Sequence, residues 1–256
     1  MNSVERFSSR VEDYVRYRPG YPRALLETLA RDCGFGPESV VADIGCGPGN
    51  LAAVFLENGN AVHGVEPNSA MREAGRALLA RFEKFDAREG SAEATGLPAE
   101  SVDFVTAGQA FHWFDPPAAR AEFRRILKPG GWVALAWNER GRRVSGFLDE
   151  YEELVERHAP DYRAIRERRN DEKSIAGFFG GGEVRRALYE HSQWFDFEGV
   201  KGRLLSSSYT PQAGHPNHLP MLEDLRRAFE RHAREGRVEF PYEMTLWYGR
   251  LGAGGA

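Results

Sequence analysis

The segment Val40–Gly49, VVADIGCGPG, decides the fold expected for this chain of 256 residues. Apart from Asp43, its first five residues are apolar and mostly β-branched, as expected of a short strand buried on both faces. Glycines follow at positions 45, 47 and 49, and a helical pattern begins at Asn50. Because glycine lacks a Cβ, the backbone of such a turn can approach a ligand closely. The segment therefore predicts a ligand-binding loop after the first strand of an open parallel α/β sheet.

On both sides of this segment, strand and helix patterns alternate. Up to residue 138 we expect strands at 39–44, 60–66, 84–89, 102–107 and 132–137, and helices at 24–30, 50–57, 69–82 and 116–127. Such alternation predicts a parallel sheet with helices on both faces and right-handed crossovers. After residue 139 a charged helical stretch is followed by expected strands at 188–197 and 237–249 and helices at 200–208 and 218–234.

Composition bounds the class of protein. The chain carries 34 basic and 38 acidic residues, a net charge of −4, which does not predict attraction of its whole surface to nucleic acid or anionic membrane. Two cysteines are too few for a disulfide framework or a four-cysteine zinc site, and we predict no metal site. No apolar run approaches the roughly 20 residues that span a bilayer, and the first residues lack the apolar run of a signal peptide. We therefore expect a cytoplasmic protein.

Two acids indicate the kind of ligand. A dinucleotide fingerprint needs glycine where Asn50 stands, which argues against a nicotinamide-dependent oxidoreductase. Asp43, two residues ahead of Gly45, would repel a pyrophosphate but suits a cationic ligand. Glu66 ends the second expected strand, 21 residues after Gly45, where an acid commonly accepts hydrogen bonds from ribose hydroxyls. The alternative for Glu66 is a solvated acid at a strand end.

Four segments in this order, VVADIGCGPGN, GVEPNSAM, GSAEATGLPAESVDFVTAGQAFHWFD and ILKPGGWVAL, resemble the successive motifs of class I S-adenosylmethionine (SAM)-dependent methyltransferases. The resemblance is strongest to the small-molecule branch typified by ubiquinone/menaquinone-biosynthesis and trans-aconitate methyltransferases. It implies a Rossmann-like, doubly wound seven-stranded sheet of order 3-2-1-4-5-7-6, with strand 7 antiparallel and a helical insertion after strand 5. It also implies one domain over 1–256, made of an N-terminal lid (1–22), a SAM-binding core (23–138), the insertion (139–187) and a C-terminal part that completes the sheet (188–250).

The resemblance further implies SAM as cofactor, S-adenosylhomocysteine (SAH) as product, and a role for each matching residue. The methionine part would lie against Asp43, Gly45 and Gly47, in the loop that also holds Cys46 and the turn residue Gly49. Glu66 would bind the ribose. The adenine would be flanked by Pro67, Asn68 and Met71 and capped by Ser91, Ala92 and Glu93, while Gln109 would open the loop that faces the sulfonium. Cys46 is expected to be a small packing residue rather than a reactive thiol.

The N-terminal segment, with Tyr14 and the run Arg18-Pro19-Gly20-Tyr21-Pro22, resembles a part of these enzymes that closes over the cofactor. Arg18 is the expected partner of the cofactor's carboxylate, because a guanidinium binds carboxylate in a bidentate manner. Tyr14 and Tyr21 would line the same site. The alternative is that RPGYP forms only a rigid turn leading into the first helix of the core.

The implied reaction is methyl transfer by in-line displacement at the sulfonium, for which the protein supplies position and desolvation. The acceptor pocket is expected to contain Ala110, Phe111, His112, Trp113, Asn138 and Tyr209. His112 is the candidate general base, since the pKa of histidine lies near neutrality. The alternative is that FHWF forms an aromatic wall that shields the acceptor or contacts the sulfonium by cation–π attraction.

The expected partner is a small-molecule methyl acceptor, without nucleic acid or a membrane span, and the oligomeric state cannot be read from the sequence. The segment GQAFHWF replaces the Asn/Asp-Pro-Pro-Tyr type of motif that acts on DNA adenine. The basic run Arg163–Arg169 is interleaved with acids, which favours a solvated helix over a nucleic-acid patch. A non-catalytic SAM-binding regulatory module is the rival function, and transfer of labelled methyl groups would separate the two.

Overall fold

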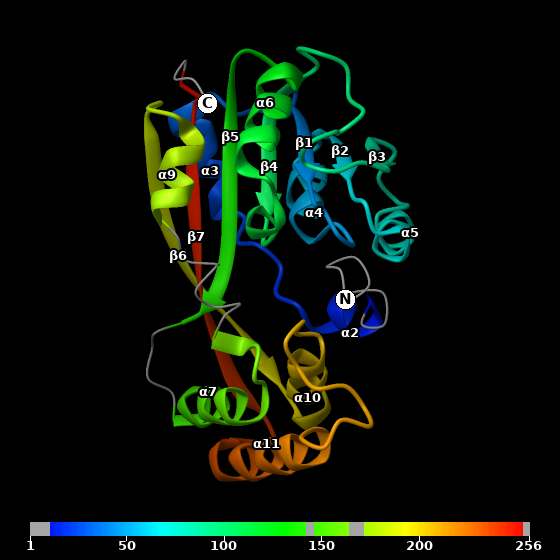
Figure 1. The fold of residues 1–256 in the computed structure, drawn as a ribbon, viewed down its shortest axis with the longest axis vertical. Helices are drawn as coiled ribbons and strands as arrows, with labels where there is room; N and C mark the ends of the chain where they lie inside the picture. Colours follow the sequence, from blue (N-terminus) through cyan, green and yellow to red (C-terminus); the bar gives the residue numbers. More distant parts are fainter. Residues whose placement is uncertain (1–10, 142–145, 164–171, 253–256) are drawn as a thin grey trace.

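The computed structural model describes residues 11–141, 146–163 and 172–252 and contains one seven-stranded sheet of order β3-β2-β1-β4-β5-β7-β6 (Figure 1). β1 to β5 pair in parallel with their neighbours, and β7 pairs antiparallel with both β5 and β6. The predicted order and the antiparallel seventh strand are therefore confirmed. The strands are β1 (Val40–Ile44), β2 (Ala61–Val65), β3 (Phe85–Arg88), β4 (Val102–Gly108), β5 (Leu127–Arg140), β6 (Val184–Phe195) and β7 (Val238–Gly249).

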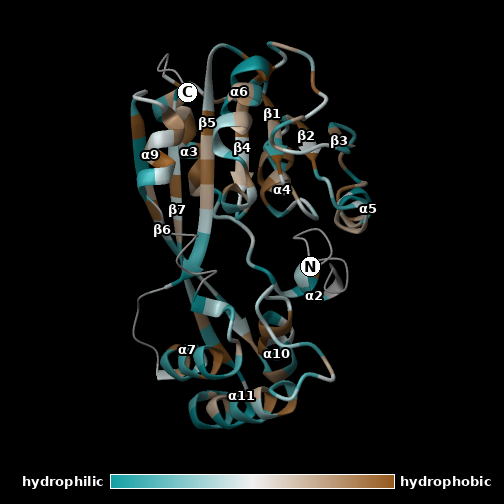
Figure 2. Ribbon diagram, in the orientation of Figure 1, coloured by the Kyte–Doolittle hydropathy of each residue, from teal (hydrophilic) through white to brown (hydrophobic). Residues whose placement is uncertain are grey.

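Helices cover both faces of the sheet, and the apolar residues of the strands lie between them (Figure 2). One face packs against α6 (Pro116–Ile126) and α9 (Glu172–Phe179), the other against α3 (Ala24–Cys33) and α4 (Asn50–Glu57). The remaining described helices are α2 (Val11–Tyr17), α5 (Ser69–Leu78), the 3-10 turn η1 (Phe111–Trp113), α7 (Gly146–His158), α10 (Phe197–Leu205) and α11 (His218–His232).

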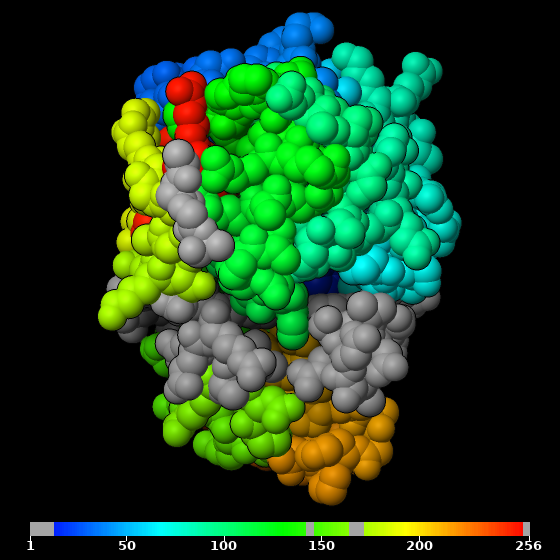
Figure 3. All heavy atoms as spheres, turned by 45° about the horizontal axis from the view of Figure 1, so that its top comes forward, coloured from blue at the N-terminus to red at the C-terminus, as the bar shows by residue number. Residues whose placement is uncertain are grey.

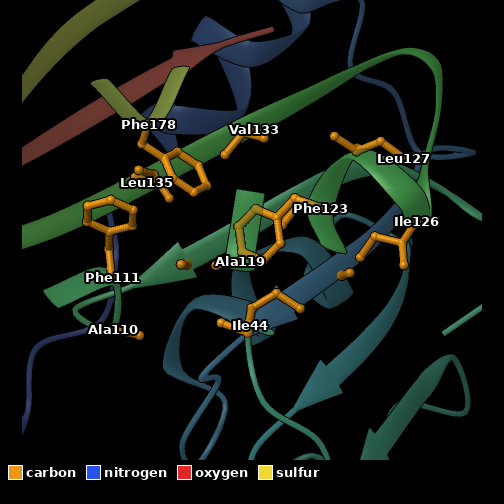
Figure 4. Packing of buried hydrophobic residues seen from close by; sticks show 14 of the residues in the cluster. Ile44, Ala110, Phe111, Ala119, Phe123, Ile126, Leu127, Val133, Leu135 and Phe178 are labelled. Carbon is orange, nitrogen blue, oxygen red and sulfur yellow. The ribbon is translucent and has the colours of Figure 1, made fainter. Parts of the chain in front are cut away.

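An aromatic cluster fills the face under α6 and α9 (Figure 4). The ring of Phe111 lies 4.9 Å from that of Phe178 and 6.1 Å from that of Trp137, in edge-to-face geometry. Phe178 also packs on Phe123 of α6. Phe111, which we expected in the acceptor pocket, is therefore part of the hydrophobic core, because its ring closes the gap between η1 and α9.

β5, β6 and β7 continue beyond the layered core and carry a small lobe made of α7, α10 and α11 (Figure 1). We expected β5 only over residues 132–137. Its first residue, Leu127, pairs with Val102, while Trp132 pairs with Phe104, so the turn residues 128–131 bulge out of the ladder. Its far end pairs with β7 as far as Arg140, which makes β5 long enough to reach the lobe.

The apolar residues of α7, which lies in the charged helical stretch expected after residue 139, pack on β7 and α11. In the space-filling view this lobe lies below the core, and dark-blue N-terminal residues are visible in the recess between them (Figure 3). Residues 1–10 of the expected lid lie outside the described residues, and so does the basic run 163–169 beyond its first residue. Within the described ranges, no helix has the length and apolar composition that a bilayer crossing requires.

Candidate functional site

A cavity lies at the carboxyl edge of the sheet, where open α/β sheets bind their ligands. It has a volume of about 790 Å³, counting the open solvent at its mouth. Loops after four strands and one residue of α2 form its wall. The lining residues are Tyr14, Gly45, Gly47, Glu66, Pro67, Asn68, Met71, Ser91, Ala92, Glu93, Gly108, Gln109, Ala110, Trp113 and Phe114.

The glycine loop forms one wall of this cavity. Gly45 has a φ of 65°, and a Cβ there would lie 2.7 Å from the Cβ of Ala110. Gly47 has a φ of 55°, and a Cβ there would meet no atom within 4 Å. The loop is fastened to β2, since the backbone N–H groups of Gly45 and Cys46 both donate to Val65 O. Cys46 is buried and does not line the cavity, while Gly49 is the N-cap of α4.

Glu66 is held rigidly between two loops. Its Oε2 accepts a hydrogen bond from the N–H of Gly47 and its Oε1 one from the N–H of Asn68, both at 2.9 Å. Arg72 supports the same turn by donating to the carbonyl of Glu66 at 2.8 Å. Burial raises the pKa of Glu66. Each carboxylate oxygen keeps a second lone pair, so the side chain can still accept hydrogen bonds from a pair of hydroxyls.

Asp43 lies behind the glycine loop and does not line the cavity. Its side chain is 1% exposed, and its Oδ1 accepts a hydrogen bond from Thr106 Oγ1 at 3.0 Å. Its Oδ2 is buried without a hydrogen bond from any described residue. Burial raises the pKa of Asp43 to about 7. A cation bound nearby would favour the ionised form and lower this pKa again, which fits a positively charged ligand.

The N-terminal segment crosses the carboxyl edge beside the cavity. The amide of Asn50 donates to Pro19 O at 3.3 Å, and that of Asn138 to Gly20 O at 3.0 Å. The hydroxyl of Tyr21 lies so close to Gly108 that a Cβ there would be 2.5 Å away, and burial raises the pKa of Tyr21. Of the three side chains expected to close over the cofactor, only Tyr14 lines the cavity.

Arg18 stacks on the Tyr14 ring, with its guanidinium carbon 5.0 Å from the ring centroid. It also donates to Ser206 O at 2.9 Å. Arg18 therefore joins the wall of the cavity to the chain after α10.

The loop after β4 forms the opposite wall. Gln109 has a φ of 57°, a left-handed conformation that costs a non-glycine residue about 1–2 kcal/mol. Its backbone N–H donates to Ala136 O at 2.9 Å and its side chain to Asn138 O, which hold it there. Ala110 and Trp113 line the cavity, whereas His112 is half-buried beside it, with its ring 4.8 Å from that of Trp113.

The other two residues expected in the acceptor pocket, Asn138 and Tyr209, are buried and lie outside the lining. Sequence reasoning missed Gly108 and Phe114, which do line it. Phe114 belongs to the quoted FHWF segment, so its position was a usable signal. Nothing in the sequence marked Gly108, because its role depends on the distant Tyr21 ring.

Comparisons with known proteins agree with this geometry. A family model described as a methyltransferase domain matches residues 42–135. An uncharacterized methyltransferase of Mycobacterium tuberculosis is 36% identical over 159 residues, 61% of each chain. One of Schizosaccharomyces pombe is 34% identical over 152 residues, 59% of each chain. The match thus spans about three fifths of the length of these relatives.

A solved structure from Anaeromyxobacter dehalogenans, provisionally described as a type II methyltransferase, is 27% identical. The match covers 92% of this chain and 98% of that one, with a TM-score of 0.69. The strand order, the glycine loop at the cavity and these relatives all indicate a methyltransferase fold. Residues 42–135 therefore match a methyltransferase domain, and the sheet has the fold of the class I methyltransferases, a class whose cofactor is S-adenosylmethionine.

Proposed function

We propose that this protein transfers a methyl group from SAM to a small-molecule acceptor and that the cavity at the carboxyl edge is the SAM site. The observation that carries the proposal is the meeting of Gly47, Glu66 and Gln109 in one cavity. These residues follow three different strands of the parallel sheet, and each matches a motif of the family. SAM supplies an electrophilic methyl group on a sulfonium, so the protein needs no strong acid or nucleophile of its own.

Each part of the cavity would then bind one part of the cofactor. Glu66 accepts hydrogen bonds from the ribose hydroxyls, with Gly47 and Asn68 fixing its carboxylate. Met71 and the 91–93 loop flank the adenine. Asp43 stabilises the positive charge of the methionine end from behind the loop. We propose that Arg18, which stacks on Tyr14 of the cavity wall, binds the methionine carboxylate, and that residues 1–22 act as the lid over the site.

The wall formed by Gln109, Ala110 and Trp113 would face the reacting methyl group. Its strained backbone is held by hydrogen bonds to β5, which keeps the wall in one position. Holding donor and acceptor at reacting distance contributes up to about 7–11 kcal/mol to lowering the barrier. A small molecule fits this arrangement, because Pro19 and Gly20 of the lid segment are hydrogen-bonded across the carboxyl edge of the sheet.

His112 keeps two proposed roles, general base or part of an aromatic wall. If it is a base, His112→Gln lowers kcat and removes the acidic limb of the pH profile for an acceptor with an ionisable proton. An unchanged profile would leave the wall as its role.

Two measurements test the proposed function. Calorimetric titration with SAM, SAH and NAD should give binding of the first two only. Incubation with methyl-labelled SAM and a metabolite extract should transfer label to a small-molecule fraction. Binding of SAM without transfer to any fraction would contradict the catalytic proposal. We also propose a cytoplasmic location, which suits the free thiols of Cys33 and Cys46.

A further inference from the structure

A cluster of arginine and tyrosine side chains lies where the ends of β5 and β7 enter the lobe. We call it the arginine–tyrosine cluster; it consists of Arg140 of β5, Tyr151 of α7, Arg203 of α10, Tyr209 after α10 and Tyr242 of β7. Tyr151 is fully buried and Arg203 is only 5% exposed. Arg140 and Tyr242 are register partners on neighbouring strands. Five separate parts of the chain thus bring the buried Arg203 and the partly buried Arg140 together.

The positive charge of this cluster is only partly compensated. Arg140 forms an ion pair with Glu152 at 2.7 Å and donates to Tyr209 Oη at 3.0 Å. Arg203 donates to Tyr242 Oη at 2.9 Å and to Ser207 Oγ at 3.3 Å. Among the described residues, no carboxylate lies within ion-pair distance of Arg203. A buried guanidinium without an acid loses hydration that its neutral partners replace only in part.

Tyr209 responds to the same charges. Although burial raises the pKa of its hydroxyl, the positive charges of Arg140 and Arg203 bring that pKa down to about 7. The cluster therefore stabilises a negative charge on an oxygen atom within it.

The hydroxyl group of Tyr151 is a further hydrogen-bond donor in the cluster. Tyr151 Oη is buried and has no hydrogen-bond partner among the described residues. Its ring lies below Arg140, whose guanidinium carbon is 5.4 Å from the ring centroid. Leaving a buried hydroxyl without a partner costs about 1–3 kcal/mol. An unused donor beside partly compensated cations is the arrangement expected of an anion-binding site.

The cluster adjoins the proposed SAM site. Asn138 precedes Arg140 by two residues on β5, about 7 Å along a strand. The backbone oxygen of Asn138 accepts a hydrogen bond from Gln109, which lines the cavity. Ser207, the partner of Arg203, lies 3.5 Å from the guanidinium of Arg18, which stacks on Tyr14 of the cavity wall. Asn138 and Ser207 therefore link the cluster to residues at the wall of the cavity.

We propose that the methyl acceptor carries a carboxylate group and that Arg203, Arg140 and the hydroxyl of Tyr151 bind it. This inference rests on the proposed function and adds the substrate class. Glu152 neutralises one of the two arginines, and Tyr209, with a pKa of about 7, offsets part of the other at neutral pH, so at most one positive charge is left for the ligand, which matches a monoanion better than a phosphate dianion. A guanidinium fork and a phenol together offer the planar donors that a carboxylate accepts.

The test uses the full chain saturated with SAH and calorimetric titration with acetate, hexanoate, benzoate and phenylacetate, each against its neutral amide. We expect at least one acid to bind about tenfold or more tightly than its amide.

Tyr151→Phe should weaken that binding about tenfold, while the melting temperature stays equal or rises, because the lost hydroxyl has no partner among the described residues. Arg203→Met should abolish the preference for the acid. The matched control is Tyr248→Phe at the other end of β7, whose hydroxyl bonds Asp32 and which should change nothing here.

The failures are distinguishable. If SAH binds but no acid is preferred over its amide, or if Tyr151→Phe binds acids as tightly as the wild type, the inference is wrong and the proposed function stands. If phenyl phosphate binds more tightly than every acid, the assignment to carboxylate is wrong. If SAH itself does not bind, the proposed function fails and the inference fails with it.

Discussion

The cavity at the carboxyl edge and the arginine–tyrosine cluster lie side by side but are built in different ways. Backbone, glycines and the fixed carboxylate of Glu66 make up much of the cavity wall, from loops that all lie at the same sheet edge. The cluster consists of long side chains from five elements between residues 140 and 242. The topology of the sheet alone fixes the position of the cavity, whereas the position of the cluster depends on how the lobe packs. Different substitutions should therefore disrupt the two sites.

The largest effect is expected at Gly45. Gly45→Ala adds a Cβ at 2.7 Å from that of Ala110 and keeps a left-handed backbone that alanine adopts only at a cost of about 1–2 kcal/mol. Overpacking adds about 1–3 kcal/mol. Calorimetry should show SAH affinity reduced by about thirtyfold or more. The matched control is Gly36→Ala, where a Cβ meets no atom within 4 Å, and equal losses in both variants would contradict the assignment of the loop.

Glu66 comes next. Glu66→Gln removes the charge that the ribose hydroxyls would meet and puts an amide N–H₂ against one of the two backbone donors. Hydrogen bonds to charged groups contribute about 1.5–3 kcal/mol, so SAH affinity should fall about ten- to a hundredfold. Glu57→Gln, on the outer end of α4, is the control. If Glu66→Gln lowers only the melting temperature and SAH binds as before, Glu66 holds the loops and does not bind the ribose.

The candidate roles of Gly45 and Glu66 could be predicted from the sequence because each residue belongs to a short contiguous motif at a strand end. The strand order followed from the family motifs in the same way. Phe111 was misplaced because one letter in FHWF cannot tell which ring turns toward α9. Arg203 and Arg140 gave no local signal, since an arginine among charged residues is ordinarily solvated. Their burial results from long-range packing on a strand that extends further than its apolar run.

Asp43 offers a smaller effect that tests the electrostatics of the cavity. At pH 7, a carboxyl with a pKa of about 7 is half protonated in the free protein. The ammonium group of SAH would lower that pKa, so binding should release about half a proton, and affinity should rise with pH between 6 and 8. Titrations in buffers of different ionisation enthalpy measure this release. Asp43→Asn should remove it, and release that persists in this variant would assign the proton to another group.

The smallest expected signal belongs to the cluster. Tyr209, with a pKa of about 7, should ionise near neutrality, seen as a phenolate band in the ultraviolet spectrum. Arg140→Met should shift this titration to higher pH, because it removes a cation that donates to the phenol oxygen at 3.0 Å. Tyr209→Phe should remove it, and Asp43→Asn should leave it unchanged. A shift of the Tyr209 titration caused by Asp43→Asn would mean that the charge of Asp43 acts on Tyr209. The description of the cavity and the cluster as electrostatically separate sites would then be wrong.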